Sequence, residues 1–201
     1  MARPYRLGKR ALGVAATRQR IMDATRVLIE RGGLDTANIQ AIAKLAGVTR
    51  PTVYQQFGSL QELLLAVTNE ALDNADVRAV RKALQLPDAG KAVRGMLRAS
   101  CKFWNSEFVL FSRIKGLALI DDAARHVDDI KEQVRRGHVE NIVGRLSNQG
   151  LLKKGLSRRD AADRLYLLCS FEVFERLRRA GHSADAIAAR LIDLADETIL
   201  A

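Results

Sequence analysis

The chain has 201 residues, 48% of them hydrophobic, and a net charge of +10. That much apolar content can bury a real core, so a disordered basic tail is excluded, and the length fits one domain or a small domain joined to a larger one. No apolar run approaches membrane-spanning length, the start lacks a secretory signal pattern, and two cysteines make no disulfide framework, so we expect a cytoplasmic protein.

The N-terminal segment, residues 1–16, is basic and is expected to form an arm. Basic residues precede the first acid of the chain, Asp23: Arg3, Arg6, Lys9, Arg10, Arg18 and Arg20. Through residue 60 there are ten Lys or Arg against three acids. Such an arm can neutralise phosphates and make DNA binding depend on salt. The alternative is a short basic terminus that is merely solvated.

Residues 38–57 have the pattern of a helix-turn-helix. One apolar stripe at helical period is formed by Ile39, Ile42, Ala43 and Ala46. Asn38 is a suitable N-cap for this helix. Gly47 lies where the chain must turn, since a residue without Cβ adopts left-handed backbone at little cost.

The second helix of the motif begins after Thr49, which can cap it, and Pro51 is tolerated in the first turn. Val53 and Phe57, four residues apart, should face inward. The outward set is then Arg50, Pro51, Thr52, Tyr54, Gln55 and Gln56. Arg and Gln can read purine edges, and hydroxyl groups reach phosphates. The alternative is an ordinary helical hairpin with a solvated polar face.

Residues 17–72 resemble the N-terminal domain of the TetR (tetracycline-repressor-like) family of transcriptional regulators. The resemblance rests on a first helix ending at Gly32 and Gly33, on the apolar core of the second helix, and on the residue types of the third. It implies that the third helix enters the major groove, that Tyr54 touches the DNA backbone, and that the arm and the start of the second helix add phosphate contacts. The DNA-binding residues expected are Arg18, Asn38, Gln40, Thr49, Arg50, Pro51, Thr52, Tyr54 and Gln55.

Two positions depart from the family pattern. The family commonly has a phosphate-contacting lysine at the third position after the phenylalanine that ends helix three, where this chain has Leu60. Pro51 stands where small residues are common. The motif is retained, but the base readout of the family does not transfer residue by residue.

In the remainder of the chain, apolar residues recur at the spacing of an α-helix, which predicts an all-α fold. Ser59 and Glu62 form a capping box that opens the next helix. A loop at residues 86–90 separates it from helices predicted over residues 91–106, 108–120 and 121–148. We expect a three-helix DNA-binding domain over residues 17–63 joined to a larger helical effector-binding and dimerisation domain over residues 64–201.

The last two helices, predicted over residues 158–180 and 184–200, carry more apolar residues than one narrow stripe. A helix apolar over so much of its circumference must be buried on more than one side. We expect a homodimer in which these helices pair with their copies, as the resemblance also implies, because paired DNA half-sites require two-fold symmetry. The alternative is a fully buried helix within a monomer.

The family resemblance also implies a small-molecule pocket among the central helices. Aromatic and sulfur side chains gather there and could line an apolar pocket: Met96, Phe103, Trp104, Phe108, Phe111, Tyr166 and Cys169. The alternative for each is ordinary core packing, because helical spacing alone produces such stripes.

Catalytic and metal-binding patterns are missing from the sequence. The histidines, His126, His138 and His182, are spread apart, and no HExxH, phosphate-loop or GxSxG spacing occurs. We therefore expect that the protein is not an enzyme and holds no cofactor or metal. We expect a homodimeric transcriptional regulator, a repressor rather than an activator, that binds a near-palindromic operator and responds to a small-molecule effector. The competing interpretations are a sequence-tolerant architectural protein and an α-helical scaffold or enzyme.

Overall fold

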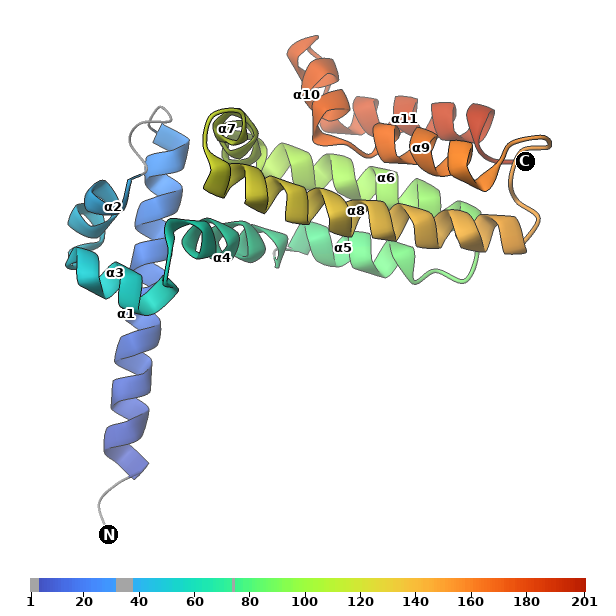
Figure 1. Ribbon diagram of the computed structural model, residues 1–201. Helices are drawn as coiled ribbons and strands as arrows, with labels where there is room; N and C mark the ends of the chain where they lie inside the picture. The colour runs from blue at the N-terminus through green and yellow to red at the C-terminus, as the bar shows by residue number, and fades with distance from the viewer. Residues whose placement is uncertain (1–3, 32–37, 74) are drawn as a thin grey trace. The chain divides into compact units, whose positions relative to one another are not determined.

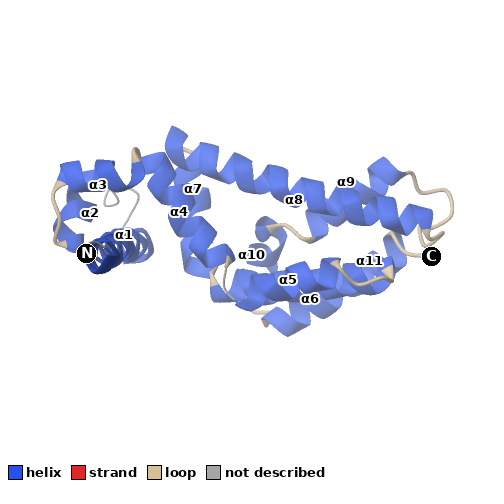
Figure 2. Ribbon diagram, turned by 90° about the horizontal axis from the view of Figure 1, so that it is seen from below, coloured by secondary structure: helices blue, strands red, loops and turns tan. Residues whose placement is uncertain are grey.

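The computed structural model describes residues 4–31, 38–73 and 75–201, with side chains for residues 12–31, 38–73 and 78–201. Its described elements are helices joined by loops (Figure 2), with one isolated bridge between Leu152 and Leu200. The helices in chain order are α1 (Pro4–Arg31), α2 (Ile39–Ala46), α3 (Arg50–Phe57), α4 (Leu60–Leu72), α5 (Ala75–Leu84), α6 (Ala89–Ser106), α7 (Phe108–Ala118), α8 (Asp122–Asn148), α9 (Arg158–Leu168), α10 (Phe171–Arg179) and α11 (Ala184–Thr198). The all-α prediction is confirmed for these residues.

The chain divides into two compact units. The first comprises Met1–Ala71 with Ser112–Asp128, and the second comprises Leu72–Phe111 with Asp129–Ala201. Helix α4 runs without interruption through the boundary expected after residue 63. Residues 4–16, expected as an arm, have helical backbone continuous with α1. The glycines expected to end the first helix lie outside the described residues.

In the first unit, α2 and α3 pack beside α1 (Figure 1). The residues that make this packing apolar are fully or almost fully buried: Ile21, Ala24, Ile42, Ala43, Val53, Phe57, Leu63, Leu64 and Val67. Thr25 and Thr68 are also buried, and each hydroxyl donates to a carbonyl one turn earlier in its own helix. The buried set fixes which faces of α2 and α3 remain outside.

The second unit is built around α6, which packs against α5 and α11. Its main core joins buried residues of α6, α8, α9 and α11, among them Leu97, Ile142, Leu165 and Ala195. The helices predicted over residues 91–106, 108–120 and 121–148 are all present as α6, α7 and α8, with ends shifted by a few residues at most.

One helix prediction was wrong: residues 158–180 do not form a single helix. Helix α9 ends at Leu168, and Ser170, in extended conformation, caps α10 by accepting a hydrogen bond from the Val173 amide at 3.3 Å. A serine at an N-cap satisfies an orphan amide and so can begin a new helix inside an apolar pattern. The Trp104 indole N–H donates to the Cys169 carbonyl at 3.3 Å, which satisfies a group that the break leaves without a helical partner.

The wide apolar face of the last helix is buried within a single chain. In α11, the residues Ile187, Ala188, Leu191, Ile192 and Ala195 are all buried. These residues form one broad face of α11, and its burial is provided by helices of the same molecule. Leu167 (60% exposed) and Leu194 (45%) remain as large apolar side chains at the surface of α9 and α11.

Candidate functional site

The helix-turn-helix corner is built by caps and one left-handed residue. The Asn38 side-chain oxygen accepts a hydrogen bond from the Ala41 amide at 3.0 Å and so caps α2 as predicted. Gly47 has φ of 66° and ψ of 38°, and its amide donates to the carbonyls that end α2. A methyl group at Gly47 would meet no atom within 4 Å, so glycine is required there by backbone conformation and not by space.

Helix α3 begins as the sequence predicts. The Thr49 hydroxyl accepts a hydrogen bond from the Thr52 amide at 3.4 Å, and the two threonine hydroxyls lie 2.9 Å apart. Pro51 lies in the first turn, where its missing N–H costs no helical bond. Val53 and Phe57 are buried, which confirms the predicted inward face.

The outward face of α3 is polar. Arg50, Pro51 and Gln55 are exposed, and Tyr54 has 44% of its surface exposed, while Thr52 and Gln56 are half-buried. At the start of α2, Asn38 and Gln40 are exposed as well. Arg50 makes no ion pair or hydrogen bond within the part of the chain that the structure describes. Its guanidinium can therefore bind an outside acceptor without breaking an internal contact.

Arg18 has an internal partner that the sequence did not indicate. Its guanidinium lies 3.9 Å from the centroid of the Phe57 ring, and Nη1 donates to the Gln56 carbonyl at 2.5 Å. The cation–π contact with an aromatic ring and the hydrogen bond from a charged donor to a helix-end carbonyl both stabilise the folded state. Arg18 thus ties the C-terminal end of α3 to α1, while its side chain stays exposed.

A second polar contact joins α1 to α4. The Gln19 side-chain amide donates to the Glu70 carboxylate at 2.7 Å. The entry to α4 is fixed by Ser59, whose hydroxyl accepts a hydrogen bond from the Glu62 amide at 3.1 Å, and Leu60 is half-buried beside it. The position where the resemblance leads us to expect a phosphate-binding lysine is therefore apolar and partly covered.

The expected effector residues fall into separate groups. One group is an aromatic cluster made of Phe103, Trp104, Phe108 and Phe111. The ring centroid of Phe103 lies 4.9 Å from that of Trp104 and 5.3 Å from that of Phe111, and the Trp104 and Phe111 centroids are 5.2 Å apart. Phe171 completes this cluster, at 5.4 Å from Trp104 and 5.7 Å from Phe108. The sequence pattern showed Phe171 only as part of a wide apolar face, since the break before α10 was not anticipated.

Met96 and Tyr166 belong to the layers around these rings, and Cys169 contacts the cluster through its backbone carbonyl, which accepts the hydrogen bond from Trp104. Met96 is buried in the main core of the second unit. The Tyr166 hydroxyl donates to Glu132 at 2.6 Å, and the Arg135 guanidinium lies 3.9 Å from the centre of its ring. Burial, with the hydrogen bond to Glu132, raises the pKa of Tyr166, and burial also raises the pKa of the Cys169 thiol. Neither group is poised to ionise near neutral pH.

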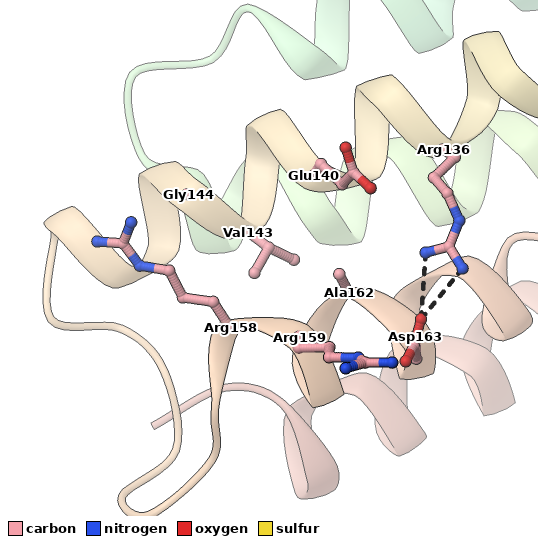
Figure 3. Close-up of a pocket in the computed structure, with 8 residues that line it drawn as sticks. All are labelled: Arg136, Glu140, Val143, Gly144, Arg158, Arg159, Ala162 and Asp163. Atoms are coloured by element: carbon pink, nitrogen blue, oxygen red, sulfur yellow. Dashed lines mark hydrogen bonds and ion pairs between the residues drawn. The ribbon is translucent and has the colours of Figure 1, made fainter.

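One hollow among the described residues lies away from the aromatic cluster. It measures about 470 Å³ and lies between α8 and α9 (Figure 3), lined by Arg136, Glu140, Val143, Gly144, Arg158, Arg159, Ala162 and Asp163. None of these was among the expected effector residues. The sequence feature that could have indicated this hollow is the Arg158-Arg159 pair at the start of a helix. Such a pair is equally typical of a solvent-exposed helix terminus.

The described residues contain neither a cluster of metal ligands nor a membrane-spanning helix. No group of three His, Cys, Asp or Glu side chains there is close enough to hold a metal ion. Among the same residues, no helix is both long and apolar enough to cross a membrane.

Comparison with known proteins identifies the first unit. Residues 21–67 match the family model for bacterial regulatory proteins of the tetR family. The HTH-type transcriptional activator FasR of Mycolicibacterium smegmatis is 42% identical over 67 residues, which are 33% of this chain and 30% of FasR. The chain is thus aligned with less than a third of the length of that curated relative.

Solved structures resemble most of the chain in fold. NalD of Pseudomonas aeruginosa, the secondary repressor of the MexAB-OprM multidrug efflux pump, is 19% identical with a TM-score of 0.73, over 94% of this chain and 98% of NalD. AibR, solved with isovaleryl coenzyme A and operator DNA, is 16% identical with a TM-score of 0.65, over 89% of this chain and 97% of AibR. Residues 21–67 therefore match the N-terminal region of the tetR family, and the described chain shares the fold of these solved structures.

Proposed function

We propose that the protein is a transcriptional regulator, a repressor rather than an activator, and that its helix α3 enters the major groove of a specific operator. The observation that carries this proposal is the outward face of α3, where Arg50 and Gln55 are exposed while Val53 and Phe57 anchor the helix inside. Arginine and glutamine can each form paired hydrogen bonds to a purine edge. Tyr54 and Thr49 would bind phosphates and set the register.

We further propose that the regulator acts as a homodimer through its last helices. Leu167 and Leu194 leave apolar surface exposed on α9 and α11. The Arg164 guanidinium donates to the Thr198 carbonyl at 2.6 Å and so holds these two helices together at one end. Two copies related by a two-fold axis would present two α3 helices to half-sites about 34–36 Å apart. Such a regulator would work in the cytoplasm, where bacterial DNA is found.

A small-molecule effector would control the affinity for DNA. AibR, of the same fold, was solved with both isovaleryl coenzyme A and operator DNA. In this chain the aromatic cluster around Trp104 is the apolar region that an effector would have to open, with Met96, Tyr166 and Cys169 in the surrounding layers. An effector changes DNA binding only through its different affinity for the two arrangements of the body.

The test is selection of bound duplexes from a random pool by the purified protein at about 150 mM salt, which suppresses binding by phosphate contacts alone. A single enriched near-palindrome, bound on the order of a thousandfold more tightly than random duplex, is expected of a specific regulator. Recovery of unrelated duplexes would favour an architectural protein. Recovery of none, with or without candidate effectors, would favour a scaffold or enzyme.

A further inference from the structure

The hollow between α8 and α9 contains positive charge that no acid within it neutralises. Arg136 is paired with Asp163, since both terminal nitrogens donate to one carboxylate oxygen at 3.1 and 3.2 Å. Arg158 donates to the Ser147 hydroxyl at 2.8 Å and to the Asn148 side-chain oxygen at 3.0 Å, which are neutral acceptors. These bonds hold the Arg158 guanidinium against the C-terminal end of α8, pointing away from that of Arg159 (Figure 3), so Arg158 adds positive charge at one end of the hollow.

Arg159 and Glu140 have no partner within the part of the chain that the structure describes. In Figure 3 they lie on opposite walls, Arg159 on α9 and Glu140 on α8. Setting aside the Arg136–Asp163 pair, the hollow holds two guanidinium groups against one carboxylate. The field inside it therefore favours an anion, and Glu140 lowers the affinity for one.

The wall between these charges is apolar. Val143 of α8 and Ala162 of α9 are both buried and line the hollow. Gly144 also lines it, and a methyl group there would meet no atom within 4 Å, so the missing side chain leaves space beside the arginines. A volume of about 470 Å³ falls within the range of small-molecule sites.

We propose that this hollow binds a small organic anion, a carboxylate or phosphate monoester, whose acidic head pairs with Arg159 and whose apolar body rests on Val143 and Ala162. Guanidinium groups match both head groups because their donors form a planar fork. The site is distinct from the aromatic cluster proposed for the effector, and the inference does not depend on DNA binding.

The test is isothermal titration of the full-length protein with hexanoate and with hexyl phosphate, at constant ionic strength, with hexanol as the uncharged probe. Saturable binding of one or both anions but not of hexanol is expected, and the ratio of the two affinities identifies the head group. Arg159→Gln should weaken anion binding about tenfold or more. Glu140→Gln should strengthen it, because it removes the opposing charge.

Two further variants separate a site from general charge. Arg190→Gln removes an exposed charge of α11 that does not line the hollow, and should leave the affinity within about twofold. Gly144→Leu adds bulk without changing charge and should abolish binding. Equal losses in Arg159→Gln and Arg190→Gln, absence of saturable binding, or undiminished binding by Gly144→Leu would each overturn the proposal.

The oligomeric state is measured on the same samples. An Arg159→Gln variant that changes the sedimentation of the protein would assign the hollow to a contact between protein chains, and would likewise overturn the ligand proposal. Because no DNA enters these experiments, their failure would leave the proposed regulator function untouched.

Discussion

Arg50 is the side chain of α3 best placed to read a base. It is exposed, follows the Thr49 cap directly, and has no internal partner among the described residues. Arg50→Ala should cost about 1–3 kcal/mol of operator binding and should relax preference at one operator position. The measurement is titration of the selected operator and of its single-base variants.

Tyr54→Phe is the matched change, since it removes only a hydroxyl from the same face. If Tyr54 binds phosphate, the variant should weaken all duplexes by a similar factor and leave the order of preference intact. An Arg50→Ala protein with unchanged affinity and unchanged preference would mean that α3 does not face the groove in the orientation proposed.

Arg18 has two possible roles that stability measurements can separate. Its contacts with Phe57 and the Gln56 carbonyl stabilise the fold, whereas a phosphate contact would act only on the complex. Arg18→Gln should lower the free energy of unfolding by about 1 kcal/mol, measured by urea denaturation without DNA. Arg20→Gln, which removes another exposed charge of α1, is the control and should change stability by much less. Equal stability of both variants would leave only the phosphate role for Arg18.

The turn between α2 and α3 depends on one backbone conformation. Both Gly47 and Gly137 have room for a methyl group, but Gly47 has φ of 66° and Gly137 lies inside α8. Gly47→Ala should therefore destabilise the protein by about 1 kcal/mol, and Gly137→Ala should stabilise it by up to about 1 kcal/mol. Thermal unfolding of the two variants should shift in opposite directions. A shift of the same sign in both would contradict the argument from backbone conformation.

Local rules predicted the helix-turn-helix because its determinants are close in sequence. Asn38, Gly47 and Thr49 act on residues within one turn, so their roles follow from residue type and spacing. The contact of Arg18 with Phe57 joins positions 39 apart, and no local pattern indicates it. The break at Ser170 was missed because the apolar spacing continues across it, and the break in turn determines where Phe171 packs.

The hollow between α8 and α9 illustrates the same limit for binding sites. Its lining comes from two segments separated by a loop, so its volume depends on how the helices pack and not on either sequence pattern. Aromatic residues expected to line a pocket, such as Phe103 and Trp104, are in ring-to-ring contact. Residue types alone do not distinguish a filled cluster from the wall of a cavity, because both require apolar side chains at helical spacing.

For the whole molecule, the proposed dimer rests on a small exposed apolar surface, because Ile187, Leu191 and Ile192 of α11 are already buried within their own chain. Leu194→Glu should dissociate the dimer, since it places a charge where apolar contact is required. Leu119→Glu alters a still more exposed leucine, at 79%, just after α7, and should leave the oligomeric state unchanged. The measurement is sedimentation at several protein concentrations, followed by titration of the selected operator.

A monomeric Leu194→Glu variant should retain its fold and its weak affinity for a single half-site, and should lose the steep concentration dependence of binding to the full palindrome. If both leucine variants remain dimeric, the copies meet through some surface other than that around Leu194. If both become monomeric, residues near α7 also take part in the interface. Operator affinity that stays unchanged in a protein shown to be monomeric would contradict the two-fold arrangement itself, because the paired half-sites would then add nothing to binding.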